Sequence, residues 1–94
     1  LWLCSDGPGA RGHDGLWVIE TAGADRARSR HFYSPPAGAE CCSPSFTPDG
    51  AAVFVSIQHP SEGSASIDQA MTRWPDDNTD RPPRPSVVVI SALG

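Results

Sequence analysis

The sequence predicts an all-β protein built from antiparallel strands. Short runs of β-branched and aromatic residues, which are typical of strands, alternate with segments rich in Gly, Pro, Asp and Ser, which are typical of turns. The clearest turn is Pro48-Asp49-Gly50, because it separates Phe46 from the apolar run at 53–57 in the manner of a β-hairpin. The one apolar stretch with helical spacing, 67–74, covers only about two turns.

Three strands are expected in the first part of the chain, at 1–4, 16–20 and 30–33. The first runs into a turn that begins with Ser5, Asp6 and Gly7. The second is apolar on both faces, as expected for a strand that is buried between layers of sheet. The charged segment 23–28 is expected to form a solvated hairpin tip before the third strand.

The second part of the chain is expected to begin with a hairpin and to end with a strand. The hairpin strands are 41–46 and 53–58, and Pro60 closes the second because proline donates no ladder hydrogen bond. A long loop follows at about 63–85, with a helical turn at 67–74 and with Trp74 packed onto the sheet. The β-branched run 86–91 predicts a buried strand that pairs centrally or closes the sheet.

Charge and composition exclude several classes of function. The 94 residues carry a formal net charge of −4, which argues against nucleic acid and anionic membranes as partners. All seven basic residues are Arg, which we interpret as nucleotide-composition bias rather than as a phosphate-binding arginine array. No apolar run approaches the roughly 20 residues that span a bilayer. The sequence also lacks nucleotide-binding glycine loops, the HExxH zinc motif and a nucleophile elbow.

The cysteines Cys4, Cys41 and Cys42 are too few and too irregularly spaced for a disulfide framework or a zinc site. We therefore expect them to be small buried apolar side chains. The adjacent pair would point to opposite faces of a strand. A bridge between Cys4 and Cys42 is compatible with the sequence, but nothing in the sequence supports it.

A set of short motifs follows a characteristic order along most of the chain. FTPDG is common in β-propeller repeats, whereas QHP, WPD and RPSVVVI are more specific. The motifs are SDG at 5–7, DGLW at 14–17, GAE at 38–40, FTPDG at 46–50, QHP at 58–60, WPD at 74–76 and RPSVVVI at 84–90. In this order and spacing they resemble the carboxy-terminal part of the PhoX-type alkaline phosphatases.

The resemblance implies a six-bladed β-propeller that hydrolyses small phosphate monoesters with Ca²⁺ and Fe³⁺. It also implies export of the folded protein by the twin-arginine route, hence a periplasmic or secreted location, although LWLCSDG has no signal-peptide features. A chain of 94 residues is long enough for one to two blades. We therefore expect a carboxy-terminal fragment, inactive alone, that lacks the earlier, metal-bearing blades.

The resemblance also assigns candidate site residues. Glu40 matches a metal ligand of the family and is expected in a loop at a strand entrance; the alternative is an ordinary surface glutamate. Asp6, at a strand end, is a second candidate ligand for a hard cation, and the alternative is a plain Asp-Gly turn. No catalytic residue is assigned, and the iron-associated cysteine of the family belongs to an earlier region.

His59 and Glu62 are expected near the same rim as Glu40. His59 can orient a carboxylate or bind a metal directly, and it can equally serve only to hydrogen-bond a turn. Asp49 is expected to be a turn former. The alternative function is a non-catalytic β-propeller scaffold or binding protein, and QHP and WPD argue against a propeller lactonase.

Overall fold

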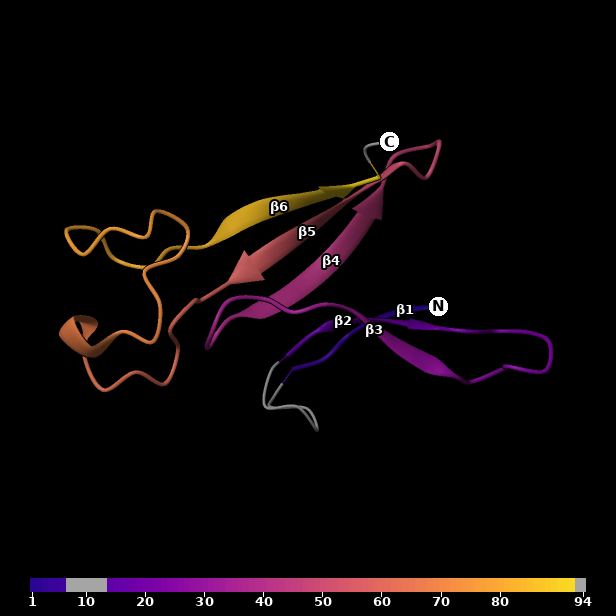
Figure 1. Cartoon of the computed structure of the whole chain (residues 1–94), viewed down its shortest axis with the longest axis horizontal. Coiled ribbons are helices and arrows are strands. Elements are labelled where there is room, and N and C mark those ends of the chain that lie inside the picture. Colours follow the sequence, from indigo (N-terminus) through magenta and orange to yellow (C-terminus); the bar gives the residue numbers. More distant parts are fainter. Residues whose placement is uncertain (7–13, 93–94) are drawn as a thin grey trace.

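The computed structural model describes residues 1–6 and 14–92, which form two three-stranded antiparallel sheets (Figure 1). The first sheet has the order β1 (Trp2–Cys4), β2 (Leu16–Ile19), β3 (Ser29–Tyr33). The second has the order β4 (Glu40–Phe46), β5 (Ala52–Gln58), β6 (Ser86–Ser91). The all-β, antiparallel prediction is confirmed, and the arrangement is compatible with propeller blades.

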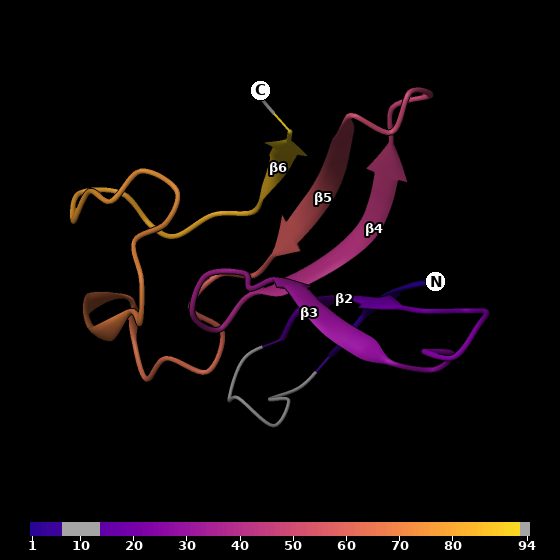
Figure 2. The ribbon, with the colours of Figure 1, turned by 45° about the vertical axis from the view of Figure 1, so that its right-hand side comes forward.

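The first sheet lies beside the β4 edge of the second (Figure 2), and the hydrophobic core combines Leu16 of β2 with residues in and next to β4 and β5. Trp2 fastens one end of this junction, since its ring lies 5.0 Å from that of Phe32 and 4.9 Å from that of Phe46. The predicted packing of Trp74 onto the sheet is also observed. The buried apolar residues are Leu16, Ala39, Cys41, Val53, Val55 and Ile57.

The β4–β5 hairpin has the predicted turn. Asp49 Oδ1 accepts hydrogen bonds from Thr47 Oγ1 (2.6 Å) and from the Ala51 amide (3.0 Å), and Gly50 has a φ of 71°. A bulge between Cys42 and Ser45 interrupts the strand pairing, which the sequence analysis did not predict. The turn thus forms through hydrogen bonds between neighbouring residues, whereas the bulge depends on how β4 pairs with β5.

The expectation that 86–91 is a buried strand is wrong. β6 pairs with β5, and its side chains alternate between half-buried and exposed. Val88 and Ile90 pack against the core, but Val87 and Val89 remain 63% and 52% exposed. Among the described strands β6 lies at the edge of its sheet. A run of β-branched residues alone did not indicate whether one face of the strand or both faces would be buried.

The β5–β6 connection, 59–85, is the predicted long loop and extends away from both sheets in Figure 1. The expected helical turn is short, a 3₁₀ helix η1 (Ile67–Gln69). Arg84 donates two hydrogen bonds of 2.9 Å to the carboxylate of Asp76, and this pairing lowers the pKa of Asp76. Within 1–6 and 14–92, no helix is long and apolar enough to cross a membrane.

Candidate functional site

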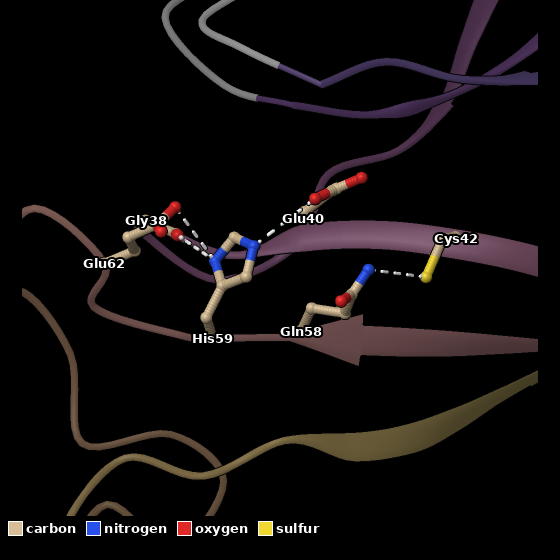
Figure 3. Close-up of polar contacts among 6 residues, drawn as sticks. All are labelled: Gly38, Glu40, Cys42, Gln58, His59 and Glu62. Atoms are coloured by element: carbon tan, nitrogen blue, oxygen red, sulfur yellow. Dashed lines mark hydrogen bonds and ion pairs between the residues drawn. The ribbon is translucent and has the colours of Figure 1, made fainter.

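Three predicted residues meet at the open end of the β4–β5 hairpin, the end where β4 begins and β5 finishes (Figure 3). His59 Nε2 lies 3.3 Å from Glu40 Oε2, and His59 Nδ1 lies 3.2 Å from Glu62 Oε2. Glu40 is the first residue of β4 rather than part of the preceding loop, and it pairs with Gln58. The strand register therefore places Glu40 beside the residue that follows β5.

Gly38 makes this meeting possible. Its carbonyl oxygen lies 3.2 Å from His59 Nδ1, and its φ of +72° is a conformation that side chains with a Cβ rarely adopt. A Cβ at this position would lie 2.7 Å from the backbone nitrogen and from the carbonyl oxygen of Glu62. The sequence places Gly38 in the GAE motif but gives no sign of this close approach of two backbone segments.

Ser61 fixes the turn that carries His59 and Glu62. Its side chain is buried, and its Oγ donates to the Thr72 carbonyl (2.7 Å) and accepts from the Thr72 amide (2.9 Å). Its own amide donates to the Ala37 carbonyl at 2.8 Å. Ser61 therefore joins the segment before β4 to the β5–β6 connection. Sequence reasoning missed it, because nothing in the local pattern distinguishes this serine from its neighbours.

Both ring nitrogens of His59 face acceptor oxygens. Partial burial by itself lowers the pKa of His59, but the Gly38 carbonyl and the carboxylates of Glu40 and Glu62 outweigh that effect and raise the pKa above its ordinary value. The doubly protonated ring donates from both nitrogens and carries a positive charge between the two carboxylates. His59 thus holds one oxygen of Glu40, while the other oxygen points away from the ring (Figure 3).

A pocket opens beside this group. It has a volume of about 380 Å³. It combines hydroxyl groups with apolar side chains and has His59 and Glu62 on its wall, so a small polar molecule would meet both kinds of contact. The lining residues are His59, Pro60, Ser61, Glu62, Ser64, Ser66, Ile67, Ala70 and Pro83.

The second predicted ligand, Asp6, is not among the contacts of this group. It is exposed and follows β1, and in the described part of the chain it makes no hydrogen bond or ion pair with Glu40, His59 or Glu62. Asp14, which the sequence analysis did not single out, has a buried Oδ1 atom without a hydrogen-bond partner among the described residues. An unpaired buried carboxylate oxygen is costly, so Asp14 is the stronger candidate for a cation contact.

The three cysteines are free. Burial, together with the neighbouring Cys4 thiol, raises the pKa of Cys41 to about 12. Cys42 is half-buried, and its sulfur accepts a hydrogen bond of 3.0 Å from Gln58 Nε2. The expectation that Cys41 and Cys42 point to opposite faces agrees with this difference in burial. Cys41 is therefore a protonated core thiol at neutral pH.

The carboxylates are the right type of ligand for a hard cation, but too few of the described ones lie together to form a site. Carboxylate oxygens are the donors that Ca²⁺ prefers, and the orphaned Asp14 Oδ1 and the outward oxygen of Glu40 are of this type. Across residues 1–6 and 14–92, however, no group of three or more His, Cys, Asp or Glu side chains is arranged to hold a metal ion. The described residues thus provide individual oxygen donors rather than a complete metal site.

Comparison with known proteins identifies the family. A family model described as alkaline phosphatase PhoX matches residues 1–61 of the chain, which include both sheets except β6. No curated protein and no solved structure gives a significant match. The matched region contains Asp6, Asp14, Glu40 and His59, and it covers well over half of the 94 residues. The chain therefore belongs to the alkaline phosphatase PhoX family.

Proposed function

We propose that this chain is the carboxy-terminal part of a metal-dependent β-propeller phosphatase that hydrolyses small phosphate monoesters. Family membership supports the reaction class. The two antiparallel three-stranded sheets support the architecture, since sheets of this kind are the building units of propellers. In this proposal the protein acts in the periplasm or outside the cell, as the family resemblance implies.

The arrangement of Glu40 carries the proposal. Its carboxylate lies at a strand end, only 21% exposed, with one oxygen held by His59 and the other free to bind a cation. Bound Ca²⁺ and Fe³⁺ would activate an oxygen nucleophile and neutralise charge on the phosphoryl group. In this proposal Glu40 binds the metal, and His59 holds Glu40 in the binding orientation. Glu62 helps to raise the pKa of His59, while Asp6 and Asp14 are further oxygen donors.

The same proposal makes the isolated chain inactive. In this proposal the two three-stranded sheets are one to two blades, and the carboxylates of the chain are some of the donors of the site rather than all of them. The other ligands would come from the preceding blades of the propeller. Accordingly, we expect the 94-residue chain with Ca²⁺ and Fe³⁺ to hydrolyse p-nitrophenyl phosphate no faster than the metals alone. Turnover above that control would show that the chain holds a complete site.

The proposed role of Glu40 is tested by calorimetric titration of Ca²⁺ into the chain, after circular dichroism has established that it folds. We expect Ca²⁺ binding that Glu40→Ala abolishes, because removal of a carboxylate removes both a ligand and a charge. Glu20→Ala is the matched control, since Glu20 is a surface glutamate that pairs with Arg30 away from the open end. Equal binding by the two variants would favour a non-catalytic propeller scaffold.

A further inference from the structure

Cys4 and Cys41 form a pair of thiols at the junction of the two sheets. Cys4 is the last residue of β1 and is half-buried, whereas Cys41 is the second residue of β4 and is fully buried. β1 and β4 pack against each other, and Cys4 packs against the buried core cluster that contains Cys41. The two thiols are close enough for each to influence the pKa of the other. The two cysteines therefore lie on strands of different sheets and are separated by 37 positions in the sequence.

We propose that Cys4 and Cys41 are a disulfide-forming pair, and that oxidation links the two sheets covalently. A disulfide requires Cβ atoms that face each other at roughly 3.5–4.5 Å, and the packing of Cys4 against the core around Cys41 brings the two side chains together from adjoining strands. The third cysteine is not placed for this reaction. Cys42 lies on the other side of β4, where its sulfur contacts Gln58 at 3.0 Å.

The reaction is a two-step thiol–disulfide exchange with a small disulfide such as oxidised glutathione as the oxidant. The more exposed Cys4, as thiolate, attacks one glutathione sulfur, which breaks the glutathione disulfide and releases one glutathione thiolate. Cys41 sulfur then attacks the Cys4 sulfur of this mixed disulfide and releases the second glutathione. The two cysteine protons pass to the two glutathione thiolates, so the protein loses two electrons and the oxidant gains them.

Mass spectrometry of the folded chain after incubation with oxidised glutathione tests the pairing. Trypsin cleaves between Cys4 and Cys41, at Arg11, for example, so a bridge appears as two linked peptides. Cys42→Ser keeps only the proposed pair, and we expect it to lose about 2 Da before digestion and to give the linked peptides afterwards. We expect Cys4→Ala to give no intramolecular bridge, because Cys41 and Cys42 face opposite sides of β4.

A comparison with the unfolded chain separates native pairing from random pairing. In concentrated guanidinium chloride the wild-type chain should form a mixture of bridges, whereas the folded chain should bridge Cys4 to Cys41 selectively. The proposal is overturned if the folded Cys42→Ser variant retains both thiols or remains as a glutathione adduct at Cys4. It is also overturned if the folded wild-type chain bridges Cys4 to Cys42 in preference.

Thermal unfolding gives a second readout. A bridge that closes a loop of this length restricts the unfolded chain, and we expect the oxidised Cys42→Ser variant to melt on the order of 10 °C above its reduced form. Reduction with dithiothreitol should reverse the difference. An oxidised form that melts below the reduced form would show that the bridge strains the junction, and this would contradict the proposed native pair.

Discussion

The two ends of the β4–β5 hairpin are built in different ways. At the turn end, the side-chain hydrogen bonds run within the short segment from Thr47 to Ala52, and among the described residues Asp49 is hydrogen-bonded to close sequence neighbours. One backbone bond, from the Ala92 amide to the Ala51 carbonyl, comes from further along the chain. At the open end, His59 contacts Glu40 from 19 positions away and Gly38 from 21 positions away. The turn end is therefore a local structure, whereas the open end depends on the whole hairpin.

This difference distinguishes the turn end, which stabilises the fold, from the open end, which is the candidate site. The Asp49 carboxylate is exposed, and it accepts its hydrogen bonds from residues of its own turn. It therefore stabilises the turn rather than binding a group from a distant segment. The Glu40 carboxylate is more buried and is held by the His59 ring, which itself contacts a second carboxylate. Polar groups brought together from distant segments are costly to assemble, and such clusters are found preferentially at functional sites.

The largest difference between the two ends is expected for glycine replacement. Gly38 and Gly50 have nearly the same φ, +72° and +71°, but a Cβ at Gly38 would meet the Glu62 backbone at 2.7 Å, whereas a Cβ at Gly50 would meet nothing within 4 Å. Gly50→Ala should lower the free energy of unfolding by about 1 kcal/mol through backbone strain alone. Gly38→Ala should lower it by about 3 kcal/mol, because one segment must also move.

Urea unfolding followed by circular dichroism measures both variants. The Gly38→Ala chain should in addition lose the contact between His59 and the Gly38 carbonyl, which nuclear magnetic resonance would detect as a fall in the pKa of His59. Equal destabilisation by the two substitutions would mean that the close approach at Gly38 contributes nothing to stability.

The next largest effect is a pH-dependent one at His59. Because the folded-state pKa of His59 is raised, its contribution to stability is fully present below the unfolded-state pKa of about 6.5 and is lost as the pH rises through the folded-state value. His59→Gln keeps a hydrogen-bond donor but carries no charge. We therefore expect this variant to be less stable than the wild type near pH 5.5, with a smaller difference near pH 9.

Unfolding free energies of the metal-free chain at the two pH values measure this effect. Glu62→Gln is the matched control, since it removes one carboxylate next to His59 and should lower the pKa of the ring without removing it. A stability difference that stays constant or grows towards high pH would show that the neutral ring, rather than the charged one, fills the position between the carboxylates.

The sequence was sufficient for the local features of the molecule. The strands and the Pro48-Asp49-Gly50 turn follow from residue preferences within a few positions, and all are present. The long-range features were not predictable in this way. The close approach at Gly38, the double hydrogen bond of Ser61 to Thr72 and the exposed face of β6 each depend on which segment lies opposite.

The same division applies to the candidate site. The family resemblance singled out Glu40, and the QHP motif singled out His59, but only the strand register shows that the two side chains meet. Asp14 was missed, because an Asp-Gly pair reads as a turn, and only the burial of its Oδ1 marks it as unusual. The alternation in β6 was also missed, because four consecutive β-branched residues give no two-residue period.

The smallest expected effect lies at the turn end. Hydrogen bonds from Thr47 Oγ1 and the Ala51 amide lower the pKa of Asp49, so its contribution to stability is present above the unfolded-state pKa of about 4 and disappears as the pH falls through the lower folded-state value. Asp49→Asn retains an acceptor oxygen, and the backbone bonds between Thr47 and Ala52 remain. Its melting temperature should therefore fall only slightly at pH 6 and approach that of the wild type as the pH falls below the folded-state pKa. If Asp49→Asn lowered the melting temperature at pH 6 more than His59→Gln does, the turn end would be the more sensitive end of the hairpin. The distinction between a turn that builds the fold and a candidate site would then disappear.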